Sequence, residues 1–203
     1  MKFTFEQIVD DYNEHVTGHI PNYDRVIDKS INICKLYKSN ANILDFGSAN
    51  GQTLQKLYDQ GFTNLYGVEP ERTMRAVSPK LVAGYYEQMP NLQFSVILAN
   101  WVLHFIEDKI SLLEQFYRQL EQDGSLIISE KVSVDPTVKS FYYERKRAQG
   151  VSEQDIITKE KSLKGVMHVK SLGWYINQLS IIGYRQIEII DGDWGFVSLL
   201  VKK

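Results

Sequence analysis

A glycine-bearing turn near residue 45 carries the residues best suited to binding a small ligand. The apolar run 42–46 leads directly into Gly47-Ser48-Ala49-Asn50-Gly51. Glycines at a strand-to-helix turn let a ligand approach the backbone closely, because no side chain stands in the way. Asp45 immediately precedes this turn, where a carboxylate can receive the amino group of a bound molecule. Taken alone, such a glycine pair also fits a tight turn without a ligand.

Glu69 provides a second candidate at the end of the next expected strand. It follows the glycine turn by one strand–helix–strand step and precedes Pro70. An acidic residue at this place can accept hydrogen bonds from both hydroxyls of a ribose ring. An exposed glutamate before a proline is the plainer interpretation, but the preceding glycine turn favours the ribose role.

Two later segments add aromatic, amide and imidazole groups. Tyr85 or Tyr86 could stack on an adenine ring, or either could belong to the core. Asn100 ends a wholly apolar strand, so we expect it to face the ligand at the carboxyl edge of the sheet. His104 could act as a general base, or it could be a structural residue. The four histidines are dispersed, so no metal site is predicted.

Alternating strands and helices are needed to bring these groups together. Apolar runs that end in turns predict strands at 42–46, 65–68, 81–83, 94–99, 124–132, 184–190 and 196–201. Helices are expected at 5–37 (broken at Pro21), 52–60, 71–77, 109–120, 135–163 and 169–182. This order predicts an α/β fold with a mainly parallel seven-stranded sheet and helices on both faces. The last two strands should form an antiparallel hairpin around 191–193, which resembles the Rossmann-like class I methyltransferase fold.

The composition is that of an ordinary globular protein. The 203 residues are 43% hydrophobic and 24% charged, with a formal net charge of -2. We therefore predict a single domain over 1–203, with N-terminal helices in 1–40 and a helical cap in 133–167. So small a charge provides no overall attraction to nucleic acid or to an anionic membrane. Cys34 is the only cysteine, and no run reaches the ~18 apolar residues of a membrane span, so we expect a cytoplasmic protein.

From end to end, the chain resembles the bacterial carboxy-S-adenosylmethionine synthases, which act in tRNA wobble-uridine modification. The generic match is the turn Asp45–Gly51; the more specific matches are Ile20-Pro21-Asn22-Tyr23 and Lys146-Arg147-Ala148-Gln149-Gly150. The resemblance implies S-adenosylmethionine (SAM) as cofactor and a homodimer. Its cofactor contacts, joined with those expected from the turns, are Tyr23, Asp45, Gly47, Ser48, Ala49, Gly51, Glu69, Pro70, Tyr85, Tyr86 and Asn100. His104 and Tyr23 are the candidate catalytic residues.

One position departs from that family. The family enzymes hold an extra carboxylate of the cofactor with an arginine, and ungapped alignment through 152–167 places Glu160 there. A glutamate repels a carboxylate and cannot form a bidentate fork with it. The adjacent Lys161 could substitute for the arginine with less defined geometry.

Three functions remain open. The leading hypothesis is transfer of a methyl group from SAM to an unidentified acceptor, which mainly requires that the two partners be positioned. If the reaction needs a base, the candidates are His104, Tyr23 and Glu130. The second hypothesis is synthesis of carboxy-SAM from SAM and prephenate, or use of carboxy-SAM in tRNA modification. The third, a non-catalytic SAM-binding protein, conflicts with the retained Asp45 and Glu69.

A basic stretch at 134–167 has two interpretations. Its lysines and arginines alternate with three aromatic residues, a pattern that could track a nucleic-acid backbone. Acidic residues dilute the charge, so a helical cap that covers the site and contributes to a dimer contact is favoured. The expected partners are therefore a small-molecule or tRNA-pathway substrate and a second copy of the chain.

Overall fold

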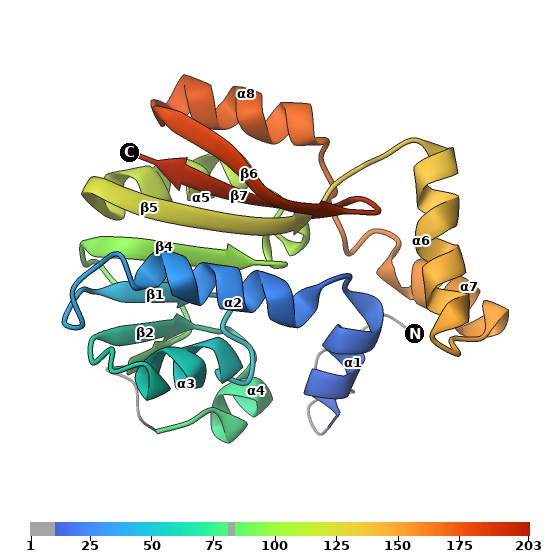
Figure 1. Ribbon diagram of the computed structural model, residues 1–203, viewed down its shortest axis with the longest axis horizontal. Helices are drawn as coiled ribbons and strands as arrows, with labels where there is room; N and C mark the ends of the chain where they lie inside the picture. The colour runs from blue at the N-terminus through green and yellow to red at the C-terminus, as the bar shows by residue number, and fades with distance from the viewer. Residues whose placement is uncertain (1–10, 81–83) are drawn as a thin grey trace.

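A mixed seven-stranded sheet forms the centre of the computed structural model, which describes residues 11–80 and 84–203 (Figure 1). The strand order is β3-β2-β1-β4-β5-β7-β6. Neighbouring strands from β3 to β5 are parallel, whereas β7 is antiparallel to both β5 and β6. The predicted mainly parallel sheet with a closing hairpin is thus confirmed. The strands are β1 (Ile43–Phe46), β2 (Leu65–Val68), β3 (Gly84–Tyr86), β4 (Phe94–Asn100), β5 (Leu120–Lys131), β6 (Gln186–Asp193) and β7 (Phe196–Lys202).

Helices pack against both faces of this sheet because its central strands are apolar on both sides. In β1, Ile43 packs with Leu54 of α3 in one hydrophobic cluster, and Leu44 packs with Phe116 of α5 in the other. Successive side chains of a strand point to opposite faces, so β1 is buried from both directions. The helices on the first face are α2 (Tyr23–Cys34) and α3 (Gln52–Asp59), and those on the second are α5 (Lys109–Gln119) and α8 (Leu172–Ile182).

Three helices lie beyond the carboxyl ends of the parallel strands, toward the right in Figure 1. They are α1 (Tyr12–His19), α6 (Pro136–Ala148) and α7 (Glu153–Leu163). The hydroxyl of Tyr142 in α6 donates a hydrogen bond of 2.9 Å to the carbonyl of His19 in α1. Lys159 of α7 lies 3.2 Å from the imidazole of His15. Helices distant in sequence thereby form one cover over the edge of the sheet. The remaining short helices are α4 (Arg72–Val77) and the 3₁₀ turn η2 (Leu103–Phe105).

The bounds of several strands differ from the expectation; β5, for example, begins at Leu120 and not at 124. The strand predicted at 81–83 lies outside the described residues, and β3 begins at Gly84. The hairpin turn is not at 191–193, because β6 continues to Asp193 and the reversal occurs at Trp194 and Gly195. Both residues have positive φ, at 44° and 85°. A two-residue turn of this kind matches the twist of paired strands, so the chain reverses there and not at the earlier polar residues.

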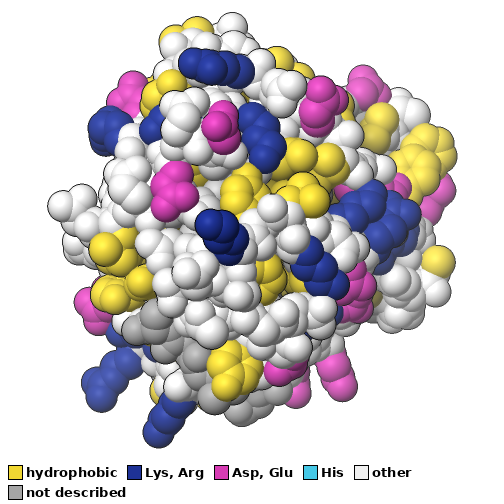
Figure 2. Space-filling view, turned by 60° about the vertical axis from the view of Figure 1, so that its left-hand side comes forward, with side chains coloured by type: hydrophobic (Ala, Val, Ile, Leu, Met, Phe, Trp, Pro, Cys, Tyr) yellow, Lys and Arg dark blue, Asp and Glu magenta, His cyan; other side chains and the backbone are white. Residues whose placement is uncertain are grey.

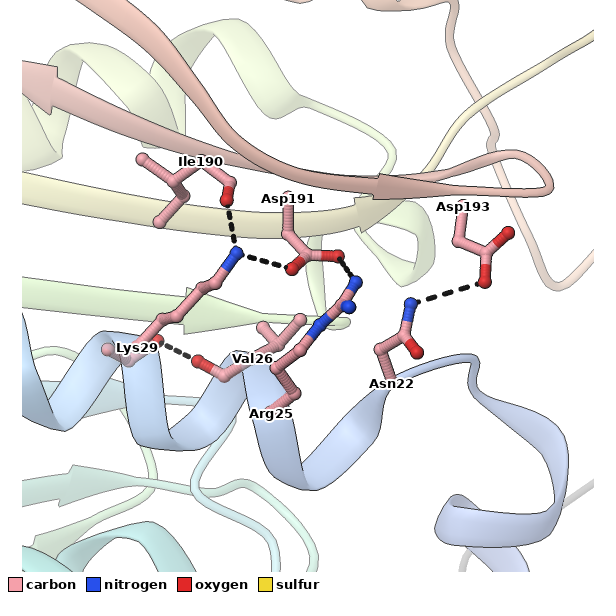
Figure 3. Close-up of polar contacts among 8 residues, drawn as sticks. Asn22, Arg25, Val26, Lys29, Ile190, Asp191 and Asp193 are labelled. Carbon is pink, nitrogen blue, oxygen red and sulfur yellow. Dashed lines mark hydrogen bonds and ion pairs between the residues drawn. The ribbon is translucent and has the colours of Figure 1, made fainter.

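Ion pairs fix the start of α2 against the C-terminal hairpin (Figure 3). Asp191 accepts hydrogen bonds from Arg25 at 2.8 Å and from Lys29 at 2.7 Å. The amide of Asn22 donates to Asp193 at 3.2 Å. The Asp191 side chain is only 4% exposed, so the carboxylate that both cations share is shielded from solvent. The network holds the first turns of α2 in place beside the edge of the sheet.

The surface carries both signs of charge. On the face shown in Figure 2, lysines and arginines are interspersed with acidic side chains. Within residues 11–80 and 84–203, none of the helices is both long and apolar enough to cross a membrane.

Candidate functional site

A cavity of about 820 Å³ opens at the carboxyl edge of the parallel strands. Its walls come from the ends of β1, β2 and β4 and from the covering helices α1, α6 and α7. A smaller hollow of about 20 Å³ adjoins it and shares five of its lining residues, Tyr12, Gly47, Ala49, Asn100 and Trp101. The larger volume is near the top of the ~300–1,000 Å³ range of small-molecule sites, so the cavity is roomy for a single ligand.

The predicted glycine turn forms the floor where the two hollows meet. Gly47 and Gly51 have φ values of +77° and +76°, and Ala49 also has a positive φ of 46°. A β-carbon on Gly47 would overlap the side chain of Val102, and one on Gly51 would overlap the hydroxyl of Tyr85. The glycines are therefore required by backbone shape and close packing. Gly47 and Ala49 line both hollows, whereas Gly51 lines neither and packs against Tyr85.

Glu69 bridges two loops and faces the cavity, as does Pro70. One carboxylate oxygen accepts from the backbone N–H of Ala49 at 3.0 Å, and the other from that of Glu71 at 2.8 Å. Burial raises the pKa of Glu69, although these two hydrogen bonds oppose the shift. Each oxygen has a second lone pair that remains available, which suits a pair of ribose hydroxyls.

The smaller hollow contains polar groups without protein partners. Asp45 is 3% exposed, and burial together with the nearby charge of Glu69 raises its pKa to about 7. Both amide atoms of Asn100 and the hydroxyl of Ser48 are buried without a hydrogen-bond partner in the described protein. Unpaired buried polar groups cost free energy. A ligand carrying an amino and a carboxylate group, as the methionine part of SAM does, fits this set.

An aromatic pair lines the wall between the smaller hollow and α2. Tyr23 stacks on Trp101 with ring centroids 4.7 Å apart, and its hydroxyl lies 3.4 Å from the amide oxygen of Gln52. Trp101 follows β4 directly and has a φ of +54°, which is rare for an aromatic residue. Tyr23 thus lines the smaller hollow, and its contact with the cofactor stays a prediction. Trp101 was missed, because nothing in its sequence context signals a left-handed backbone.

Tyr85 and Tyr86 lie away from both hollows. Tyr85 packs over Gly51, and Tyr86 stacks on another tyrosine of the sheet. From this part of the chain, the cavity is lined by the residues that follow β3, including Gln88 and Met89. The side chains of β3 point to the two faces of the sheet, whereas the loop after the strand reaches over its edge. Cofactor contact by the two tyrosines remains a prediction that the cavity lining does not support.

His104 faces the larger cavity and is held by the buried Glu130. One Glu130 oxygen pairs with Nδ1 of His104 and also accepts from the backbone N–H of Lys131 at 2.7 Å. The other accepts from the backbone N–H of His104 at 2.9 Å. A carboxylate can only accept hydrogen bonds, so Nδ1 carries the proton and Nε2 the lone pair. This arrangement orients a basic nitrogen in a site wall.

Three lysines line the outer part of the cavity: Lys131, Lys146 and Lys159. Lys131 and Lys146 approach the same ring, that of Tyr142, with their Nζ atoms 5.5 and 4.8 Å from its centroid. Burial lowers the pKa of Lys146 to about 8, and the charge of Lys131 adds to the effect. Burial likewise lowers the pKa of Lys159 to about 8. Lys146 and Lys159 belong to the basic stretch, whose sequence looks like a solvated helix surface, whereas Lys131 ends β5.

Glu160 also lines the cavity, but it already has a partner. Lys139 donates to its carboxylate at 2.9 Å. Burial opposes ionisation of Glu160, yet this hydrogen bond and the charge of Lys131 outweigh burial and lower its pKa. Lys161 is exposed and is not among the cavity residues. The structure therefore places the glutamate, and not the lysine, at the cavity wall.

Two further histidines lie in the cover. His15 and His19 stack with ring centroids 4.2 Å apart. Burial lowers both pKa values to about 4, so both rings are neutral at pH 7. Among the described residues, no group of three or more His, Cys, Asp or Glu is placed to hold a metal ion.

Fold and site together define a SAM-dependent methyltransferase of the class I type. The methyltransferase domain family matches residues 32–168, and the chain belongs to this family. The chain is similar to the carboxy-S-adenosyl-L-methionine synthase of Mannheimia succiniciproducens, at 24% identity over 99% of this chain and 93% of that protein. It is also similar to the enzyme of the same name from Haemophilus ducreyi, at 26% identity over 99% and 92%.

Solved structures share the fold. The plantazolicin methyltransferase BpumL, in complex with a monoazolic desmethylPZN analog and SAH, superposes with a TM-score of 0.71. The identity is 15%, and the match covers 98% of this chain and 90% of that one. A SAM-dependent methyltransferase from Archaeoglobus fulgidus gives a TM-score of 0.65 at 13% identity, over 96% and 100% of the two chains.

Proposed function

We propose that this enzyme transfers a methyl group from SAM, bound across the glycine turn, to an acceptor bound in the outer part of the same cavity. The proposal rests chiefly on Asn100, which lies where the smaller hollow and the large cavity meet. Its unpartnered amide lies in the smaller polar hollow, and the same residue lines the large cavity. A cofactor held by the polar groups would therefore present its reactive end to the space in front of His104.

The cofactor role follows from the chemistry of the individual groups. Asp45 would pair with the amino group, Asn100 and Ser48 would satisfy the carboxylate, and Glu69 would accept from the ribose hydroxyls. Tyr23 and Trp101 provide an aromatic wall of the kind that favours a nearby cation. Bound SAM supplies a methyl group on a positively charged sulfur that leaves as a neutral thioether.

His104 is the residue that we assign to proton removal. Nε2 would accept the proton that the acceptor's attacking nitrogen or oxygen loses when the methyl group of SAM is transferred to it. Glu130 would stabilise the resulting imidazolium through Nδ1. The carboxylate of Glu130 is itself fixed in position by hydrogen bonds from two backbone N–H groups. Tyr23 lies on the opposite side of the turn, and burial raises its pKa well above the usual range, so it is the weaker candidate for a base.

Carboxy-SAM synthesis is the second candidate. The names of the two relatives reported above favour it, and both matches extend over nearly the whole chain. Glu160, the residue aligned with the family arginine, lines the cavity as one half of an ion pair with Lys139, which counts against it. We therefore place methyl transfer first.

Mass spectrometry of the small molecules released from the purified protein tests both candidates. Release of SAM or S-adenosylhomocysteine (SAH) supports methyl transfer, whereas carboxy-SAM favours the second candidate. The purified protein should also be incubated with SAM and prephenate, and formation of carboxy-SAM would reverse the order. If calorimetry detects no binding of SAM or SAH, the chain is not a working transferase.

We also propose a cytoplasmic homodimer that acts on a small molecule or a tRNA-pathway substrate. The resemblance to the synthase family supports the dimer. The single, fully buried Cys34 suits a reducing compartment. Direct nucleic-acid binding receives little support, because Lys146 and Lys159 of the basic stretch point into the cavity and Arg147 pairs with Glu153. Light scattering and a tRNA-binding titration at two salt concentrations test these proposals.

A further inference from the structure

The outer part of the cavity carries an excess of positive charge. Lys131, Lys146 and Lys159 line it, and Glu160 is the acidic residue among them. Glu160 is already neutralised by Lys139, at 2.9 Å. The neighbouring His15 and His19 are uncharged at neutral pH. Among the described residues of this wall, Lys131 and Lys146 therefore carry positive charge that the Glu160–Lys139 ion pair does not offset.

Two of these cations converge on one spot. Lys131 comes from the end of β5 and Lys146 from α6, yet both Nζ atoms lie within 5.5 Å of the centroid of the Tyr142 ring. Lys146 is only 4% exposed. Bringing two ammonium groups together in a buried wall costs free energy by desolvation and by mutual repulsion. That arrangement is typical of an anion-binding site, because a bound anion offsets both costs. We call the site formed by Lys131 and Lys146 the anion seat.

The rest of the outer wall is apolar. Phe105, Ile106, Leu112, Leu163 and Met167 line it. Such a surface favours the hydrophobic body of a ligand and offers little to a sugar or a polar peptide. His104 lies on the same wall as Phe105, so a ligand that fills this space would reach the proposed base.

We propose that the acceptor is an acid, with a carboxylate or phosphate group bound by Lys131 and Lys146, supported by Lys159, and an apolar body lying between this seat and His104. This inference rests on the proposed methyl transfer and names the substrate class of that same site.

The charges also couple the acceptor to the cofactor. The sulfonium of SAM is positive, so Lys131 and Lys146 repel it when no acid is bound. SAH has no charge on its sulfur and is not repelled in this way. A bound acid neutralises the seat and should tighten the binding of SAM more than that of SAH. After transfer the sulfur is neutral, and this mutual support is lost, which favours release of the products.

Calorimetry on the SAH-saturated protein tests the inference with defined probes. Benzoate and phenyl phosphate are the acidic probes, and benzamide is the uncharged control of nearly the same shape as benzoate. We expect at least one acid to bind at least ~10-fold more tightly than benzamide, since loss of a charge-assisted hydrogen bond is worth about one factor of ten or more. The stronger of the two acids identifies the kind of acidic group. Equal binding of all three probes, or binding of benzamide alone, overturns the proposal.

Matched variants locate the seat. Lys131→Met and Lys146→Met keep the length of the side chain and remove its charge, and each should weaken acid binding ~10-fold while leaving the SAH affinity unchanged. Lys161→Met is the control, because that side chain is exposed outside the cavity, and it should bind the acid like the wild type. If SAH binds to every variant and acid binding is unchanged in both cavity variants, Lys131 and Lys146 do not bind the acidic group, and the proposal is overturned. If SAH does not bind even to the wild type, the proposed function itself has failed.

Discussion

His104 and Glu130 form a buried pair in which one carboxylate fixes both the ring and the backbone of the histidine. Glu130 is fully buried, at 0% exposure, and His104 is 6% exposed. The carboxylate accepts from Nδ1 of His104, from its backbone N–H and from the N–H of Lys131. Because η2 carries His104 and β5 carries Glu130, the pair also ties the loop after β4 to the neighbouring strand. The imidazole therefore has a defined tautomer and a defined orientation toward the cavity.

Replacing His104 by glutamine should reduce turnover without reducing cofactor affinity. A positioned general base contributes ~10²–10⁴-fold to rate, so kcat should fall by roughly that factor with an acceptor whose nucleophile must lose a proton. Glu130→Gln should show a smaller loss, since the amide can still receive one donor but no longer stabilises an imidazolium. Unchanged turnover in His104→Gln would remove the histidine from the mechanism.

Substitution of Glu69 by glutamine should weaken SAH binding. The variant loses charge-assisted acceptance from the ribose hydroxyls and leaves one of the backbone N–H groups of Ala49 and Glu71 with a poorer partner. Hydrogen bonds to charged groups contribute about 1.5–3 kcal/mol each, so calorimetry should show a Kd at least ~10-fold higher. Glu114→Gln is the control, because Glu114 is an exposed residue on α5. Equal SAH affinities of the Glu69 variant and wild type would contradict the ribose assignment.

Sequence reasoning located the residues at strand ends far better than the residues of the cover. Asp45 lies near the carboxyl end of β1, and Glu69 follows the adjacent parallel strand β2. The carboxyl ends of such strands meet at one edge, so the proximity of the two residues could be predicted. Lys131 and Lys146 could not be paired in this way, because β5 and α6 meet only through the tertiary packing of a cap. No such rule places Tyr85, because a three-residue strand carries no pattern that decides which face its side chains occupy; this residue lines neither hollow.

Loss of Asp191 should destabilise the fold without touching the cavity. Asp191→Asn removes the charge that Arg25 and Lys29 share, and we expect the free energy of unfolding to fall by roughly 1–2 kcal/mol, between the values for exposed and buried pairs. Burial raises the pKa of Asp191, but the hydrogen bonds from both cations outweigh it and lower the pKa overall. This stabilisation is present above the unfolded pKa of about 3.9 and is lost as the pH falls through the lower folded value.

Thermal unfolding at pH 7 and pH 3 measures this effect. The difference in Tm between wild type and Asp191→Asn should be clear at pH 7 and should shrink in acid. Asp28→Asn serves as the matched control, because the Asp28 side chain is 65% exposed and lies 3.6 Å from its lysine partner. Exposed substitutions of this kind usually change stability by less than about 0.5 kcal/mol. A pH-independent difference would mean that packing, and not charge, explains the contribution of Asp191.

Cofactor binding should depend on pH through Asp45. Burial and the charge of Glu69 raise the pKa of Asp45 in the unliganded protein to about 7. An ammonium group pairs only with the ionised carboxylate, so binding in acid requires that Asp45 first lose its proton. SAH affinity should therefore be highest above pH 7 and should fall by up to ~tenfold for each pH unit below it. In Asp45→Asn the affinity should be lower throughout and the slope should be reduced, with a remainder from Glu69, whose pKa is also raised. Calorimetry between pH 5.5 and pH 8.5, in buffers of different ionisation enthalpy, measures both the affinity and the protons released. A wild-type slope that persists unchanged in Asp45→Asn would show that Asp45 is not the group that meets the amino end of the cofactor.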